Sequence, residues 1–328
     1  MSEPTDALKM QPKTPADLPE VHPPSAGFIV QLFGIPLAIV AVAVIVWLLF
    51  GKLATDQRMP EDYLAEMKSS NFERRWAAAR ELAGILPRHK HWQGNEAFAE
   101  KLAAELEHQL ASGTTAPKET RYLQYIAQSL GEFSSQTPIR ALRMALNQEL
   151  DRDVRDAAVM GLGHLADRIG GIQDPGAISD LLAMTEDQDE SIRLRAIWVL
   201  GNTANPAAVE GLSPLVDHPD SEVRFNAATS LARLGSPSGL ETLSEMLDLN
   251  SVKKGLEDRR LSNSQIQSQM EAVPWSALQS LSILLDRAPG THLEHLRPAI
   301  EKLSKEGSPV VRTRAKELLI KMSEPPNP

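Results

Sequence analysis

One recurring pattern restricts the fold of this chain more than any other feature of its sequence. In five segments an arginine is followed by apolar residues three and seven positions later, and in four of the five also by one four positions later. This spacing places the apolar residues on one face of an α-helix. The arginines are Arg75, Arg155, Arg193, Arg224 and Arg312. Two further segments, Tyr122–Phe133 and Val273–Leu284, keep the apolar positions and lack the arginine.

A second, shorter amphipathic stretch lies between successive copies of this pattern, so the chain is predicted to form helix pairs joined by short polar turns. Arg155 and Arg193 are 38 residues apart, and Arg193 and Arg224 are 31 apart. Helix pairs at such a spacing are typical of an α-solenoid, because each pair leaves an apolar edge that only its neighbour can cover. The shorter stretches include Ala177–Thr185, Pro206–Val216, Gly239–Leu247 and Leu293–Leu303.

Residues 186–247 resemble HEAT repeats, and most closely the short subclass found in bilin lyases. They show its acidic turn, its Val-Arg pair, its Ala-Ala pair and its Leu-Gly pair. The resemblance is specific over residues 137–247 and looser over 60–136 and 248–322. It implies about seven repeats in a curved, right-handed superhelix, with the second helix of each pair on the concave side. It implies no particular activity, since HEAT arrays are mostly binding surfaces.

A membrane-spanning helix is predicted ahead of the repeats. The segment from Phe28 to Phe50 has 23 residues and no charge. About 20 apolar residues are enough to cross a hydrocarbon core of ~30 Å. Pro36 is expected to kink this helix. The alternative is a cleaved signal peptide, but the run is longer than a signal peptide's apolar region and no basic segment adjoins it.

The predicted fold class is all-α, an α-solenoid of about seven HEAT-like helix pairs preceded by one transmembrane helix. Residues 1–26 are rich in proline, acidic and small polar residues, which favours disorder. The predicted order is a disordered tail (1–26), the transmembrane helix (27–51), a linker (52–59) and the solenoid (60–322). The solenoid contains an insertion at about 249–272 and is followed by a disordered tail (323–328).

The charges beside the apolar segment predict its orientation. Basic residues near a span tend to remain in the cytoplasm. They cluster after the span, where Lys52, Arg58, Lys68, Arg74 and Arg75 lie. We therefore expect a single-pass protein with its N-terminus outside and its solenoid in the cytoplasm.

The composition excludes several kinds of chemistry. The formal net charge is −9, which argues against a nucleic-acid partner. The sequence has no cysteine, so disulfides, thiolate metal sites and cysteine nucleophiles are excluded. The repeated His-Glu dipeptides of HEAT-type di-iron hydroxylases are missing. His89–Trp92 and Glu186–Glu190 could hold a metal, but we interpret them as a solvated loop and a polar turn. No cofactor and no enzymatic activity are expected, although bilin lyases bind a chromophore.

The repeated arginines are interpreted as structural. They lie beside turns that carry carboxylates, so a series of Arg–carboxylate pairs between repeats is predicted. The expected acceptors are Asp153, Asp189, Glu190 and Asp220.

Two departures from the repeat are candidate functional features. The first is the insertion at about 249–272, a polar loop between Leu247 and a helix expected to begin near Val273. The second is an apolar strip of residues one or five positions after the arginine position, on the face opposite the core. These predicted protein-binding residues are Leu194, Trp198, Phe225 and Trp275. Exposed apolar patches often mark interaction sites. The alternative is that the insertion or a neighbouring helix covers these rings.

These features predict a membrane-anchored scaffold or adaptor that binds a protein partner through its concave face. The alternative is a structural subunit of a membrane-bound complex. A HEAT-type enzyme is the third possibility, and no residue set in the sequence supports it.

Overall fold

The computed structural model describes residues 25–54, 58–113, 116–257 and 261–324. It divides into two compact units, Met1–Arg58 and Met59–Pro328, each described by itself. Most of the two predicted disordered tails lies outside the described residues. The described ends of both tails are partly helical, since helices begin at Ala26 and end at Ser323.

The first unit contains a nearly continuous apolar helix. It comprises α1 (Ala26–Ile29), a π-helical segment η2 (Val30–Gly34) and α2 (Ile35–Ala54). Residues Ala26–Leu48 are long and apolar enough to cross a membrane, and none of them is buried within the protein. An N-terminal signal sequence would also pass this test of length and composition.

A kink is predicted at Pro36, and the structure has a π-helical segment that ends two residues before this proline. Proline has no N–H to donate, and its ring excludes the carbonyl four residues earlier. A π-helix replaces the usual bonds with bonds to the fifth preceding residue, which is one way for a helix to accommodate such a gap.

The second unit is built of helices, with no strand among its described residues, and its seven helix pairs agree with the predicted fold class. The first helices of the pairs are α3 (Pro60–Met67), α6 (Glu96–Ala111), α8 (Ile139–Met144), α10 (Pro175–Met184), α12 (Pro206–Leu212), α14 (Leu240–Leu247) and α17 (Arg297–Glu306). The second helices are α4 (Phe72–Ile85), α7 (Pro117–Leu130), α9 (Arg152–Ile169), α11 (Glu190–Asn202), α13 (Ser221–Arg233), α16 (Asn263–Arg287) and α18 (Pro309–Ser323).

Short helical segments connect several of these elements. They are η3 (Leu86–Arg88), α5 (Lys90–Gln93), η4 (Ser213–Asp217), η5 (Pro237–Gly239), α15 (Leu249–Glu257) and η6 (Glu294–Leu296).

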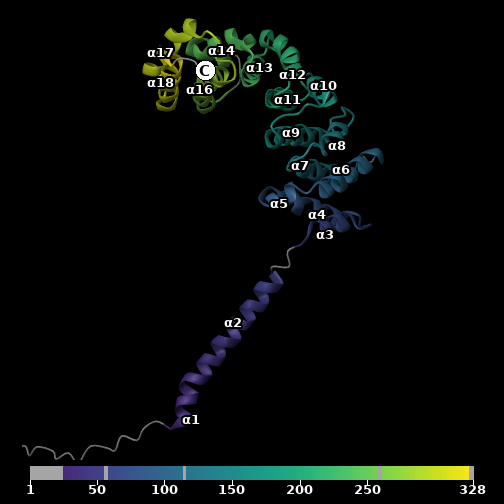
Figure 1. Cartoon of the computed structure of the whole chain (residues 1–328). Helices are drawn as coiled ribbons and strands as arrows, with labels where there is room; N and C mark the ends of the chain where they lie inside the picture. The colour runs from purple at the N-terminus through teal and green to yellow at the C-terminus, as the bar shows by residue number, and fades with distance from the viewer. Residues whose placement is uncertain (1–24, 55–57, 114–115, 258–260, 325–328) are drawn as a thin grey trace, which may run out of the picture. The chain divides into compact units, whose positions relative to one another are not determined.

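The helices form two layers that follow a curve. Each second helix packs against the second helix of the next pair, from α4 to α18. We call this row of second helices the inner layer, because Figure 1 shows it on the inner side of the curve, with α6, α8, α10 and α12 outside it. The position implied by the HEAT resemblance for the second helices is therefore confirmed.

Local sequence explains why each inner-layer helix starts where it does. The side chains of Asp151, Asp189 and Asp220 each accept a hydrogen bond from a backbone N–H in the first turn of the following helix. The repeated alanines behind these caps are buried, and they allow neighbouring helices to approach closely. At Gly131, an added Cβ would lie only 2.7 Å from the Cα of Gly161, so α7 and α9 meet through two glycines.

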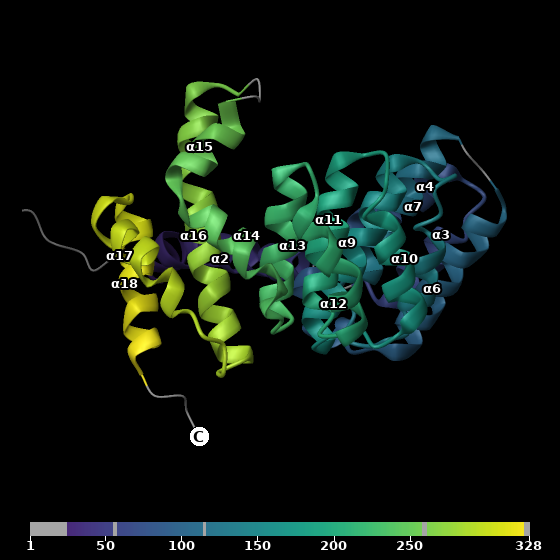
Figure 2. The same ribbon diagram turned by 90° about the horizontal axis from the view of Figure 1, so that it is seen from above.

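The insertion differs from its prediction, because it is mainly helical and not a loop. Residues Leu249–Glu257 form α15, and α16 begins at Asn263, ten residues before the expected start near Val273. Ser262 caps α16 in a reciprocal arrangement with Gln265. Val252 and Leu256 are buried, which explains why α15 is held against the protein. Figure 2 shows α15 and the start of α16 projecting beyond the ends of the neighbouring inner-layer helices.

Candidate functional site

Three of the five repeated arginines connect neighbouring repeats, as predicted, but through other carboxylates than expected. The guanidinium of Arg155 binds both carboxylate oxygens of Asp187 in the next repeat, at 3.0 Å each. Arg75 pairs with Glu119 at 2.6 Å, and Arg224 pairs with Glu245 at 2.8 Å. All three acceptors belong to the repeat that follows the arginine.

Three of the four carboxylates expected as acceptors have other or additional roles. Asp189 and Asp220 cap helices with their side chains, and Asp189 also pairs with Arg152 at 3.0 Å. Asp153 lies beside Arg152 at 3.1 Å. For Asp153 and Asp189 the expected partners were wrong, because both carboxylates pair with Arg152 and not with a repeated arginine.

A second function of the arginines was not predicted. Arg155 donates to the carbonyl of Leu150 at 2.6 Å, Arg193 to that of Asp187 at 2.8 Å, and Arg224 to that of His218 at 2.9 Å. Arg312 donates to the carbonyl of Gly307 at 2.9 Å. In each case the accepting carbonyl lies five or six residues before the arginine, in the turn that joins the two helices of one repeat. The guanidinium therefore satisfies carbonyls that the turn leaves unpaired.

Two other arginines pair with carboxylates across the inner layer. Arg168 of α9 reaches back to Glu132, next to the end of α7, and Arg195 of α11 reaches back to Asp156 of α9. Glu132 also lies 3.4 Å from Nδ1 of His164. The hydrogen bond to Glu132 raises the pKa of His164. Burial raises the pKa of Glu132, but the hydrogen bond from His164 and the charge of Arg168 outweigh it and hold that pKa below its ordinary value.

The four predicted protein-binding residues lie on three consecutive inner-layer helices, α11, α13 and α16, but differ in exposure. Leu194, Trp198 and Phe225 are half-buried, and Trp275 is 40% exposed. Leu194 and Trp198 pack against the larger core cluster, while Phe225 packs against the smaller one. The expectation that all four side chains point away from the core therefore agrees with the exposure of Trp275. The other three side chains are more buried than expected, because each packs against a core cluster.

Packing between inner-layer helices accounts for the difference. A Cβ added at Gly163 of α9 would lie 2.8 Å from Cζ3 of Trp198. The glycine thus leaves the space that the indole of the next helix occupies. The Trp198 side chain points away from the core of its own repeat, but it is partly buried because it packs against α9, the preceding inner-layer helix.

Trp275 belongs to a groove that also involves the insertion. The groove has a volume of ≈ 500 Å³ and lies between the first half of α16 and the first turn of α18. Trp275 and Val310 are its exposed large apolar side chains, 40% and 52% exposed. The remaining lining residues are Ser264, Gln267, Ser268, Glu271 and Ala272. The insertion and the strip therefore meet at Trp275.

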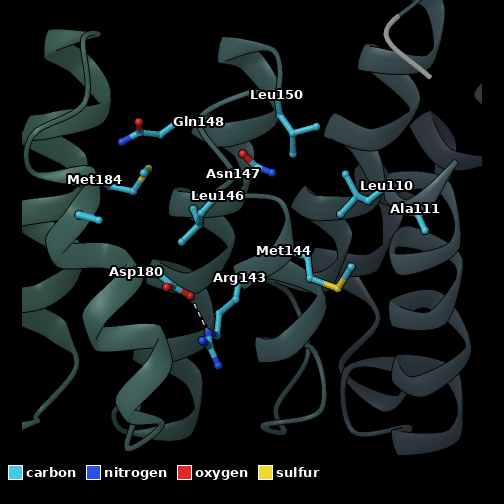
Figure 3. A pocket seen from close by; sticks show the side chains of 11 residues that line it. Leu110, Ala111, Arg143, Met144, Leu146, Asn147, Gln148, Leu150, Asp180 and Met184 are labelled. Atoms are coloured by element: carbon cyan, nitrogen blue, oxygen red, sulfur yellow. Dashed lines mark hydrogen bonds and ion pairs between the residues drawn. The ribbon is translucent and has the colours of Figure 1, made fainter. Parts of the chain in front are cut away.

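Another groove, of ≈ 510 Å³, lies among α6, α8, α10 and the segment that joins α8 to α9. Figure 3 shows Leu110, Met144 and Leu146 along it, and Arg143 directed toward Asp180. The Nε of Arg143 is 2.7 Å from the carboxylate of Asp180. None of the four predicted binding residues lines this groove.

The described residues contain no group of three or more His, Cys, Asp or Glu side chains that could hold a metal ion. The segment His89–Trp92 includes a short helix, α5, and the His89 ring stacks on Trp92 with centroids 4.5 Å apart. In the acidic turn, Asp187 accepts from Arg155 and from the backbone N–H of Asp189. Both segments have packing or capping roles in this structure.

The repeat geometry agrees with a comparison to known families, in which residues 178–254 match HEAT repeats. This segment is similar to a HEAT-repeat array. It begins within α10 and ends within α15, so it contains Leu194, Trp198 and Phe225. No curated protein matches the chain.

Several solved structures are similar to the chain. An engineered protein from a structural genomics consortium is 19% identical, with a TM-score of 0.43 over 81% of this chain and 69% of the other. A designed armadillo repeat protein is 18% identical, with a TM-score of 0.37 over 81% of this chain and 100% of the other. The complex of CpcE and CpcF of phycocyanin lyase from Nostoc sp. PCC7120 is 21% identical, with a TM-score of 0.40 over 81% and 95%.

Proposed function

We propose that this protein is a membrane-anchored scaffold that holds a partner protein on the inner layer of its HEAT-type solenoid. The observation that carries the proposal is the run of large apolar side chains on three adjacent inner-layer helices, namely Leu194, Trp198, Phe225 and Trp275. Apolar and aromatic side chains at a surface favour protein binding, and tryptophan is enriched among residues that dominate binding energy.

Membrane attachment is supported by the apolar helix of the first unit. Ala26–Leu48 has the length and composition of a span, and no residue of it is buried. The basic residues that follow it in the sequence, from Lys52 to Arg75, favour a cytoplasmic solenoid. The solenoid would then present its inner layer to partners in the cytoplasm at the membrane surface.

A binding role is also supported by the chemistry of the side chains. Several ionisable groups of the inner layer form pairs, such as Arg168–Glu132 and Arg195–Asp156. The described part of the chain has no clustered metal ligands, and the sequence has no cysteine nucleophile. We therefore propose a non-enzymatic role with no bound cofactor.

Crosslinking in membranes followed by purification of the full chain in mild detergent tests this proposal. A scaffold should retain one or more crosslinked proteins, and replacing both Trp198 and Trp275 with alanine should reduce them. A stoichiometric integral-membrane partner that stays bound without crosslinking would instead favour a structural subunit of a membrane complex. Recovery of the same proteins by the double variant would contradict the assignment of the binding face.

A further inference from the structure

Three consecutive inner-layer helices each direct an arginine back toward the helix before it. Arg168 of α9 and Arg195 of α11 each meet a carboxylate, Glu132 and Asp156. Arg233, at the end of α13, meets neutral groups. Its Nη2 donates to Oγ of Ser230 at 2.9 Å and to the backbone carbonyl of Trp198 at 3.5 Å.

Arg233 leaves most of its donor capacity unused. A guanidinium has five N–H donors. The Nε of Arg233 is buried and has no partner, and no described residue accepts a hydrogen bond from Nη1, which is not buried. Burial lowers the pKa of Arg233 to about 10, and the charge of Asp167 opposes that shift without reaching ion-pair distance. The isolated chain thus holds a partly desolvated cation without an anion, which is unfavourable.

The backbone of Trp198 lies next to this cation. Arg233 contacts the Trp198 backbone carbonyl, and the Trp198 indole covers Gly163 of α9. Trp198 is half-buried, so a partner segment that reaches Arg233 would also meet this residue. Because the negative charge of Asp167 already acts on Arg233 and a single guanidinium is available, a singly charged anion fits this place better than a doubly charged phosphate.

We propose that Arg233 binds an aspartate or glutamate side chain of the partner protein, with an apolar residue of the same segment resting on Trp198. The carboxylate takes the position that Glu132 and Asp156 occupy for Arg168 and Arg195. Charge-assisted hydrogen bonds of this kind combine strength with directional specificity. The inference rests on the proposed scaffold function and adds the chemistry that the partner must supply.

Random peptides displayed on phage, selected against the detergent-solubilised full chain, test the inference. Enriched peptides should carry Asp or Glu beside an apolar residue. Changing that acid to its amide should weaken binding to the wild type by at least about tenfold, and should have little effect on binding to Arg233→Gln. The control Arg121→Gln removes one exposed charge from α7 and should bind like the wild type.

The outcomes distinguish the role of Arg233 from the proposed scaffold function. Peptides that bind Arg233→Gln as tightly as the wild type, but are lost with Trp198→Ala, would overturn the role of Arg233 and leave the scaffold function standing. If no peptide binds the wild type, or if binding is unaffected by both Trp198→Ala and Phe225→Ala, both proposals fail.

Unfolding temperature supplies a readout independent of any partner. Arg233→Met removes a buried donor without an acceptor and should raise the melting temperature of the full chain, whereas Arg168→Met breaks an ion pair and should lower it. A lower melting temperature for Arg233→Met would show that Arg233 serves the fold, and would overturn the inference.

Discussion

The ion pair between Arg155 and Asp187 is the residue-scale contact that most directly joins two repeats. The Arg155 side chain is 11% exposed and that of Asp187 only 2%. Replacing Asp187 with alanine should cost about 3–5 kcal/mol of stability, because it leaves the arginine buried without its anion. The measurement is the free energy of unfolding in urea.

A surface ion pair provides the matched control. Glu107 lies 3.6 Å from Arg140, whose side chain is 80% exposed. Glu107→Ala should cost at most about 1 kcal/mol. Equal losses from the two variants would contradict a special role of the Arg155–Asp187 pair.

The contact between His164 and Glu132 predicts a defined pH dependence. Because the pKa of His164 is raised, its contribution to folding stability is complete below the ordinary pKa of 6.5 and is lost as the pH rises through the raised pKa. The lowered pKa of Glu132 means that its contribution is complete above 4.5 and is lost as the pH falls through the lowered value. The melting temperatures of the wild type and His164→Gln should therefore differ most between about pH 4.5 and 6.5. A difference that persists unchanged to pH 9 would refute the pair.

The arginine positions could be predicted from sequence, whereas their partners could not. The three- and seven-residue spacing after Arg155 or Arg224 depends only on the helical period. The partner of Arg155 depends on how far the next repeat is shifted relative to the repeat of Arg155. That shift is set by tertiary packing. Sequence reasoning also missed the arginine–carbonyl bonds, although the position of the arginine in the first turn of each helix is a usable signal.

At the scale of the element, α16 shows where sequence signals compete. Pro274 occupies the arginine position of the repeat, and proline favours the first turn of a helix. A start near Val273 is predicted because the apolar pattern of the repeat resumes over Val273–Leu284. The structure places Pro274 inside α16, which Ser262 caps eleven residues before Val273. The cap and the burial of the adjoining α15 against the protein outweigh the local cost of the proline.

This arrangement predicts that α16 is stabilised by removing the proline. Pro274 is buried within a 25-residue helix, where proline costs about 3 kcal/mol relative to alanine. Pro274→Ala loses some packing, so we expect a net gain of about 1–2 kcal/mol in the free energy of unfolding. Pro309→Ala, in the first turn of α18, is the control and should change little. A loss of stability in Pro274→Ala would mean that the helix depends on the proline geometry.

For the whole molecule, the all-α solenoid and its helix pairs were predictable because each repeat carries its own periodicity. The exposure of the inner-layer residues was not predictable, because the indole of Trp198 packs against Gly163 of another repeat. The proposed membrane attachment rests on one segment alone, Ala26–Leu48.

The attachment predicts a clear difference between two chains. The full chain should stay with membranes after alkaline carbonate or high salt, whereas a chain starting at Met59 should be released, because it lacks the apolar helix. In sealed vesicles with the cytoplasmic side enclosed, added protease should spare the solenoid. Release of the full chain by salt alone would rule out the anchor, and digestion of the solenoid would reverse the orientation.

Retention of the crosslinked partner by Trp275→Ala tests the binding face most directly. Trp275 is 40% exposed and belongs to neither core cluster, and Met144 of the outer layer, 38% exposed, provides a matched control. We expect Trp275→Ala to weaken partner binding by about 2 kcal/mol or more, with little change in melting temperature, and Met144→Ala to change neither. Unchanged partner retention by Trp275→Ala, or a stability loss of the ~3–5 kcal/mol typical of a core tryptophan, would contradict the account.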